Sequence, residues 1–113
     1  MYTNQEAFNI IYTYYKNGGK PGYNSVTTEC VYNTGDGGYC PIGVLLKNNG
    51  LLEKLLPSDM SLSYNDLCKK YPDIKIVDKT FGSDLQRYHD YGVKRGALLK
   101  ELEELAKGYN LTI

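Results

Sequence analysis

Apolar and polar positions in the first part of the chain repeat with the period of an amphipathic helix. The apolar side chains that share one face are Ala7, Ile11, Tyr14 and Tyr15. Thr3 followed by Glu6 forms the capping-box pattern that begins a helix. Gly18 and Gly19 are typical of a helix end. The sequence therefore predicts a helix over residues 3–17.

The pattern then changes to short apolar runs between turn residues. KPGYNSVTTE (20–29) is typical of a loop, because it combines Pro-Gly with Asn-Ser. ECVYNTGDGGYC (29–40) predicts a β-hairpin that begins with a short strand over residues 30–32. Its turn would lie around Asp36 and Gly37, and its return strand would pass through Tyr39.

The register of this hairpin decides whether two cysteines meet. With the turn centred on Gly35, Cys30 faces Cys40 across the ladder, and Tyr32 faces Gly38. A slip of one residue would separate the two thiols. In a reducing compartment we expect Cys30 and Cys40 to lie near one another without a disulfide.

A helix is predicted directly after the hairpin. Proline is favourable at the first position of a helix, so Pro41 predicts the start and makes Cys40 the cap residue. VLL (44–46) would form the buried face, and Gly50 would end the helix. LLEKLL (51–56) predicts a second short helix that Pro57 ends.

Two further segments complete the middle of the chain. Ser63 with Asp66 forms a capping box, and Leu62 with Leu67 is placed for a hydrophobic staple. Pro72 would end that helix. DIKIVD (73–78) predicts a short strand with Ile74 and either Val77 or Ile76 turned inward.

The last third of the chain is again helical in pattern. Ser83 with Gln86 forms a third capping box, and Gly92 predicts a break. A final helix then ends at Gly108, with Lys100–Glu104 and Glu103–Lys107 pairs spaced for ion pairing. Its apolar face holds Leu98, Leu99, Leu102, Leu105 and Ala106. The sum is a mainly helical α+β fold in one domain over residues 1–113, with four to six helices and one β-hairpin or a small three-stranded sheet.

Composition narrows the classes of partner. The chain has 113 residues, 42% of them hydrophobic, which suffices for one core without disulfides or a metal. A formal net charge of zero gives no positive field for duplex nucleic acid. No apolar run is long enough to span a membrane, and the first residues lack the pattern of a secretory leader. We therefore expect a cytoplasmic protein with free thiols.

Tyrosine is unusually frequent in this composition. The chain has 12 tyrosines, two phenylalanines and no tryptophan. Tyrosine rings suit interfaces and stacking on flat ligands, because each ring is apolar and carries a polar tip. The same composition would also follow from an AT-rich genome.

Several catalytic classes are excluded by counting. His89 is the one histidine, so an HExxH zinc site, a His-Asp phosphohydrolase cluster and a deaminase zinc site are excluded. The sequence contains neither a P-loop nor a G-x-G-x-x-G segment after a strand.

Cys40 is the remaining candidate for chemistry. The positive end of a helix dipole stabilises a thiolate, and His89 followed by Asp90 would suit an activated thiol nucleophile. Neighbouring residues on a helix point about 100° apart, so we do not expect Asp90 to orient the His89 ring. Asp90 would instead meet backbone N–H groups of the hairpin or Arg87.

Two other interpretations of these residues remain open. Cys40 can be a small buried residue at a tight corner, with His89 hydrogen-bonded beneath the hairpin. Cys30, Cys40 and His89 could also form a metal site with Asp90, but no ligand spacing supports it. We therefore expect neither a metal nor a cofactor.

Two segments of the sequence resemble a known set of proteins. CVYNTGDGGYCPIGVLL (30–46) and DLQRYHD (84–90) together resemble small uncharacterised proteins of bacteriophages and prophages, over nearly the whole chain. Those proteins share a Cys-x-Tyr hairpin, a Cys-Ala-Val-Gly-like helix start and a Leu-Gln-x-x-His-Asp helix. Pro41 stands where alanine is more usual, and VLL replaces a Leu-Ile-Pro-like end. The matching positions are Cys30, Tyr32, Cys40, Gly43, Leu85, Gln86, His89 and Asp90.

The resemblance implies a phage accessory protein in the host cytoplasm but no established activity. We expect it to bind a host component, either an anionic nucleotide-like signal that it sequesters or a host defence protein that it blocks. Backbone N–H groups at the helix start would bind an anionic group, and tyrosines would stack on a base. The expected ligand-binding residues are Tyr32, Tyr39, Cys40, Gly43, Gln86, His89 and Asp90.

Two alternatives accompany this expectation. One is a cysteine-dependent hydrolase or transferase that uses Cys40, His89 and Asp90. The other is a purely structural pairing of hairpin and helix. A homo-oligomer would also fit, because small phage binders often build sites between subunits.

Overall fold

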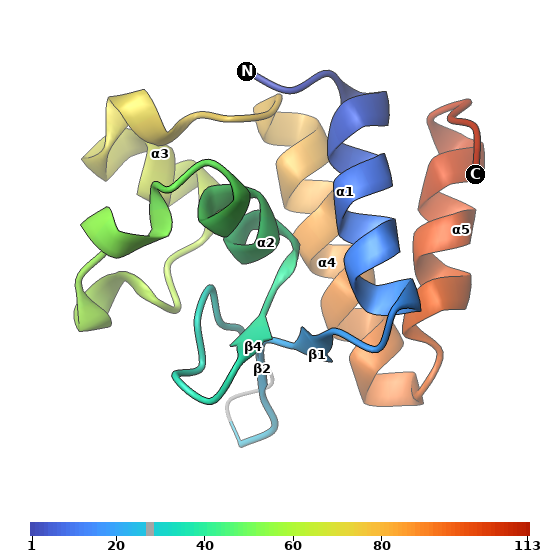
Figure 1. Cartoon of the computed structure of the whole chain (residues 1–113), viewed down its shortest axis with the longest axis horizontal. Helices are drawn as coiled ribbons and strands as arrows, with labels where there is room; N and C mark the ends of the chain where they lie inside the picture. The colour runs from blue at the N-terminus through green and yellow to red at the C-terminus, as the bar shows by residue number, and fades with distance from the viewer. Residues whose placement is uncertain (27–28) are drawn as a thin grey trace.

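The structure is a computed structural model that describes residues 1–26 and 29–113. Five α-helices and four two-residue strands in this part of the chain make the mainly helical α+β fold that the sequence predicts (Figure 1). The helices are α1 (Asn4–Lys16), α2 (Pro41–Asn48), α3 (Tyr64–Lys70), α4 (Lys79–Arg95) and α5 (Leu98–Gly108). The strands are β1 (Lys20–Pro21), β2 (Tyr23–Asn24), β3 (Glu29–Cys30) and β4 (Gly38–Tyr39). Three 3-10 turns are η1 (Leu52–Lys54), η2 (Pro57–Asp59) and η3 (Pro72–Ile74).

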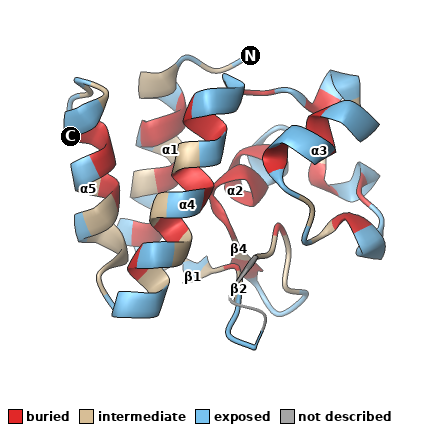
Figure 2. Cartoon of the chain, turned by 180° about the vertical axis from the view of Figure 1, so that it is seen from behind, coloured by how far each residue is buried: buried red, intermediate tan, exposed pale blue. Residues whose placement is uncertain are grey.

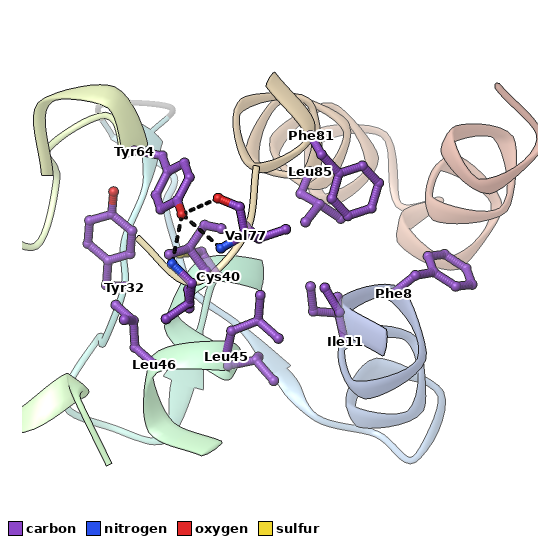
Figure 3. Packing of buried hydrophobic residues seen from close by; sticks show 14 of the residues in the cluster. Phe8, Ile11, Tyr32, Cys40, Leu45, Leu46, Tyr64, Val77, Phe81 and Leu85 are labelled. Carbon is purple, nitrogen blue, oxygen red and sulfur yellow. Dashed lines mark hydrogen bonds between the residues drawn. The ribbon is translucent and has the colours of Figure 1, made fainter. Parts of the chain in front are cut away.

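The helices lie in two groups around one core. In Figure 1, α1, α4 and α5 stand side by side, α2 and α3 lie beside them, and the strands lie below. Figure 2 shows that α2 is buried through most of its length, whereas the longer helices bury one face. Within the core, Phe8 and Ile11 of α1 lie close to Phe81 and Leu85 of α4 (Figure 3). No helix among the described residues is both long and apolar enough to cross a lipid bilayer.

The predicted start and end of the first helix are confirmed. The Thr3 hydroxyl accepts a hydrogen bond from the Glu6 amide at 3.1 Å, and the Glu6 carboxylate accepts one from the Thr3 amide at 2.9 Å. Both bonds satisfy amide groups that a helix start otherwise leaves unpaired. Gly18, with φ of 87°, follows the helix end.

The predicted hairpin over residues 30–40 is wrong in its pairing. β4 pairs in parallel with β1 through Lys20 and Gly38, and β3 pairs antiparallel with β2 through Tyr23 and Cys30. The one antiparallel pair in the described chain therefore joins residues 23–24 to 29–30. A turn does form near Gly35, where the Thr34 amide bonds the Gly38 carbonyl at 3.0 Å and the Cys40 amide bonds the Val31 carbonyl at 3.1 Å, but the strands β3 and β4 pair with β2 and β1 instead of with each other.

Glycines explain this pairing. The segment that the sequence predicts as a loop after Gly19 lies between the two arms of the expected hairpin. A Cβ atom on Gly22 would stand 2.1 Å from the Val31 carbonyl oxygen, and one on Gly43 would stand 2.1 Å from the Tyr32 carbonyl oxygen. Only glycine permits such approaches of backbone to backbone. We call the four strands together with the start of α2 the glycine corner.

The helix start at Pro41 is confirmed, whereas the strand over residues 73–78 is not. Cys40 is the cap residue of α2 and Pro41 its first residue. Residues 73–78 instead form the end of η3 and an extended segment held by one side chain: the Tyr64 hydroxyl bonds the Val77 carbonyl at 2.7 Å and the Ile76 and Val77 amides at 3.2 Å (Figure 3). A side chain thus replaces the neighbouring strand, and Ile74, Ile76 and Val77 are all buried.

The predicted boundaries of α4 are also wrong. The helix begins earlier, because Asp78 caps it by accepting from the Phe81 amide at 3.1 Å, so Ser83 lies inside the helix. Gly92 does not break the helix, which ends at Gly96 with φ of 67°. Gly92 instead lets α5 approach, since a Cβ there would stand 2.8 Å from Leu98 Cα.

α5 follows its prediction in extent but not in its ion pairs. Leu102, Leu105 and Ala106 are buried. Lys107 pairs with Glu104 at 3.5 Å instead of with Glu103, which accepts from the Tyr12 hydroxyl at 2.5 Å.

The two ends of the chain are held by α1 and its neighbours. The Gln5 side chain donates to the Thr112 carbonyl and accepts from the Thr112 amide, both at 2.8 Å. The Tyr2 amide bonds the Ile76 carbonyl at 2.7 Å. Both ends therefore lie on the same side of the fold (Figure 1).

Candidate functional site

Gln86 joins the segments that the sequence predicted to meet. Its side-chain amide donates to Cys30 Sγ at 2.7 Å and to Cys40 Sγ at 3.3 Å. Its carbonyl oxygen accepts from the Ile42 amide at 3.2 Å. The predicted proximity of Cys30 and Cys40 is thus confirmed. The two residues are not paired in one ladder, but the Cys40 amide donates to the Val31 carbonyl at 3.1 Å, and Gln86 contacts both thiols.

His89 and Asp90 interact directly, which corrects the expectation that neighbouring helical residues cannot. His89 Nδ1 lies 2.9 Å from Asp90 Oδ1. The 100° angle separates the directions of the Cβ atoms, and side-chain rotation brings the tips together. His89 is fully buried beneath the Tyr15 ring, whose centroid lies 5.6 Å from that of the imidazole. Its Nε2 atom has no hydrogen-bond partner within residues 1–26 and 29–113.

Cys40, the candidate nucleophile of the enzyme alternative, is closed to solvent, and a different thiol faces a pocket. Cys40 is 0% exposed. Cys30 is half-buried and lies at a pocket of ≈ 290 Å³. We call this the thiol pocket; its lining is Cys30, Ser61, Leu62, Ser63, Tyr64, Ser83, Gln86 and Asp90. The lining comes from three separate parts of the chain, namely β3, residues 61–64 and α4, so no local pattern in the sequence predicts this pocket.

Electrostatics make Cys30 a poor nucleophile. Burial raises the pKa of the Cys30 thiol well above its usual range. The neighbouring Cys40 thiol and the Asp90 charge raise this pKa further, against a smaller opposite effect of Gln86. The thiol is therefore protonated at neutral pH, whereas a nucleophilic cysteine reacts as the thiolate.

One cluster in the described chain has the residue types of a metal site. Cys30, His89 and Asp90 each offer one ligand atom, and the three atoms lie within 4.8 Å of one another. Sulfur, imidazole nitrogen and carboxylate oxygen are the ligands of zinc and related ions. Cys40, which the sequence placed in such a set, does not belong to this cluster.

Two of the predicted ligand-binding residues serve packing. Tyr32 is 0% exposed, and its hydroxyl donates to the Leu62 carbonyl at 2.6 Å. Gly43 is buried against the Tyr32 backbone. Neither residue is accessible to a ligand.

Tyr39 lies in a separate groove on the other side of α2. This groove of ≈ 440 Å³ is lined by Ile10, Tyr14, Tyr39, Val44, Lys47 and Asn48, and we call it the tyrosine groove. The Tyr14 and Tyr39 rings meet edge to face with centroids 6.1 Å apart. Lys47 Nζ lies 4.6 Å from the Tyr39 ring centroid.

Of the residues that line this groove, only Tyr39 is among the ligand-binding residues expected from the sequence. The periodicity predicts Tyr14 only as part of the apolar face of its helix, and Lys47 directly follows the predicted buried face of α2 at residues 44–46. The signal that was available is the spacing of Val44 and Lys47, which puts them on one side of a helix. Tyr14 comes from α1, and no local pattern connects the two helices.

No family model, no curated protein and no solved structure matches this chain.

Proposed function

We propose that the chain is a phage-type accessory protein that binds a small anionic aromatic ligand, such as a nucleotide-like signal, in the tyrosine groove in the host cytoplasm. The observation that carries this proposal is the place of Lys47. Its ammonium group lies over Tyr39 at the edge of the groove, and no carboxylate of the described chain lies within ion-pair distance of it. The charge is therefore available to a phosphate.

The remaining groups of the groove suit the flat part of such a ligand. Tyr14 and Tyr39 offer ring surfaces, and Ile10 and Val44 supply an apolar wall. The volume of ≈ 440 Å³ falls within the range of roughly 300–1,000 Å³ found for small-molecule sites. Base stacking on an aromatic side chain contributes about 1–3 kcal/mol.

The helix start that the sequence favoured is less suitable for an anion. The Ile42 amide already donates to Gln86, and Cys40, Pro41 and Gly43 are buried. The nearby thiol pocket is lined by the Asp90 carboxylate, which repels an anion. These contacts support a shift of the proposed ligand from the start of α2 to the groove along its side.

Binding is also better supported than thiol catalysis. Cys40 has no exposed surface, so a substrate cannot reach it. Cys30 is accessible, but its raised pKa keeps it protonated. The hydrolase or transferase that would use Cys40 with His89 therefore lacks an accessible nucleophile.

Chemical-shift titration by NMR tests the proposal with adenosine 5′-monophosphate as the probe, compared with adenosine and with inorganic phosphate. We expect shifts at Tyr14, Tyr39 and Lys47, larger for the nucleotide than for either part. Tyr39→Ala should weaken binding by roughly 5- to 150-fold, because stacking is lost.

Lys47→Ala should weaken binding of the nucleotide but not of adenosine. Lys69→Ala, which removes an exposed lysine from α3, is the matched control and should leave both unchanged. The proposal fails if millimolar nucleotide shifts no resonance of the groove, or if both lysine variants lose binding equally.

A further inference from the structure

We propose that Cys30, His89 and Asp90 bind a transition-metal ion of the zinc class on the wall of the thiol pocket, and that this ion ties β3 to α4. The proposal is independent of the proposed nucleotide ligand, because the tyrosine groove is formed by other residues. Four properties of the cluster bear on it.

The first is geometry. One sulfur, one ring nitrogen and one carboxylate oxygen lie within 4.8 Å of each other. Ligand atoms around a tetrahedral zinc ion lie roughly 3.3–3.8 Å apart, given bonds of ~2.0–2.3 Å. Rotation of side chains by about 1 Å therefore completes the set. Cys30 comes from β3, and His89 and Asp90 from α4, so a shared ion would link elements far apart in the sequence.

The second is the state of His89. The residue is fully buried, yet its Nε2 atom has no partner among the described groups, while Nδ1 meets Asp90 at 2.9 Å. The nitrogen that would share an ion with Asp90 is therefore Nδ1, in place of this hydrogen bond, because the two ring nitrogens point in divergent directions. Nε2 stays a buried polar atom without a partner in the described chain, which costs free energy and adds no ligand to this set.

The third is charge. The side chain of Asp90 is 27% exposed, and within the described residues it forms no ion pair with lysine or arginine. The charged and titratable groups that interact with it are His89, Cys30 and Tyr15, none of which carries a fixed positive charge. A divalent cation would therefore compensate a carboxylate that the protein itself leaves uncompensated.

The fourth is the environment of the sulfur. The Gln86 amide donates to Cys30 Sγ at 2.7 Å, and the other end of the same side chain is fixed by the Ile42 amide at 3.2 Å. Amide donors held toward sulfur stabilise metal-bound thiolates. The thiol pocket is lined by Cys30 and Asp90, with His89 buried behind them, so an ion would reach the cluster from the side of these two residues.

The donor set selects the kind of ion. Calcium and magnesium take oxygen ligands, whereas a set of one sulfur, one nitrogen and one oxygen suits zinc, cobalt and copper. On binding, the thiol loses its proton to solvent and becomes the ligand.

Cobalt substitution provides the test, because Co²⁺ bound to thiolate shows a charge-transfer band in the near ultraviolet. The full chain is stripped with a chelator under a non-thiol reductant and titrated with Co²⁺, then with Zn²⁺. We expect the band to reach its full intensity at one Co²⁺ per protein chain and to disappear when Zn²⁺ is added. The Tm of the protein should be higher with Zn²⁺ than without it.

Variants assign the band to its ligands. Cys30→Ser should abolish it, whereas Cys68→Ser, which changes a buried thiol in α3, should retain it. Asp90→Asn should weaken Co²⁺ binding roughly 10- to 100-fold, and circular dichroism checks that each variant is folded. Absence of a band in the wild-type chain would overturn the proposal, as would a band that Cys30→Ser retains or that Cys40→Ser alone removes. Nucleotide binding by the chelated protein shows whether the groove works without the ion.

Discussion

The α4–α5 pair and the glycine corner are built on opposite principles. α4 and α5 follow one another in the chain, meet through side chains, and are joined by Gly96 and Ala97. In the glycine corner β1 pairs with β4 across the two intervening strands, and its strands are only two residues long. Its contacts are between backbones, at Gly22 and Gly43. Helical periodicity predicts the side-chain contacts between α4 and α5, because it shows which side chains share a face. It contains no information about the backbone contacts of the glycine corner.

The largest effect is expected where backbone meets backbone. Gly43→Ala places a Cβ 2.1 Å from the Tyr32 carbonyl oxygen, which cannot move without opening the corner. We expect a loss of about 3–4 kcal/mol in the free energy of unfolding, measured by urea denaturation.

Gly108→Ala is the control for this experiment. It lies in α5 with nothing within 4 Å of the added Cβ. The change should raise stability by up to about 1 kcal/mol, because alanine loses less backbone entropy in a helix. Stability of Gly43→Ala within 1 kcal/mol of wild type would show that the corner adapts.

The next effect concerns the side chain that connects the corner to α4. Gln86→Ala leaves the buried Ile42 amide without its partner and removes the donor to both thiols. We expect a loss of about 1–3 kcal/mol by urea denaturation. Arg87→Ala, one residue later, breaks an exposed ion pair with Asp84 and should cost under about 1 kcal/mol. An equal loss of unfolding free energy in the two variants would mean that the hydrogen bonds of Gln86 do not stabilise the glycine corner.

A third, smaller effect depends on pH and lies outside both regions, in η2 and α3. The Lys70 ammonium, and after it the Tyr71 hydroxyl, lower the pKa of Asp59 from 3.8 to about 2. Because the folded pKa is the lower one, this stabilisation is complete above pH 3.8 and is lost as the pH falls toward 2. Asp59→Asn should therefore be less stable than wild type at pH 6, with a difference that shrinks toward pH 2.

Urea denaturation across this pH range measures that difference. The exposed Asp66→Asn in α3 serves as its control and should follow wild type. A constant difference between Asp59→Asn and wild type from pH 6 to pH 2 would contradict the assignment.

The smallest effect is one of reaction rate and leaves stability unchanged. Iodoacetamide should alkylate Cys30 before Cys40 and Cys68, because Cys30 lines a pocket and the other two are buried. The reaction should be slow at pH 7 and faster at higher pH, since the pKa of Cys30 is raised. Peptide mass spectrometry of the chelated native protein gives the order. Modification of Cys40 within seconds would show that the corner is open and its thiol activated.

The sequence predicts those parts of the fold whose cause is local. The capping box of α1, the proline start of α2 and the apolar face of α5 each depend on residues within a few positions of one another. Residues 73–78 were predicted as a strand because their side chains are apolar, but a single hydroxyl, that of Tyr64, satisfies their backbone. No pattern within that segment contains this information.

The candidate site divides in the same way. The sequence of residues 30–46 and 84–90 predicts that these two segments meet, and the contacts of Gln86 with Cys30 and Cys40 confirm it. Which thiol is accessible depends on side chains from Ser61 to Ser83, which are not near either cysteine in sequence. The lysine of the tyrosine groove was missed for the same reason, since its aromatic neighbours belong to other elements.

The contact between Gln5 and Thr112 has a consequence for the order of elements along the chain. Its two bonds copy one rung of a β-ladder, with a side-chain amide in the place of a backbone amide. The first turn of α1 thereby holds the C-terminal residues of this sequence, and the N and C marks lie on either side of α1 (Figure 1). A peptide bridge across this turn would convert the chain into a ring whose packing is unchanged. The architecture is therefore suited to circular permutation, with new ends opened at an exposed turn such as the one at Gly50.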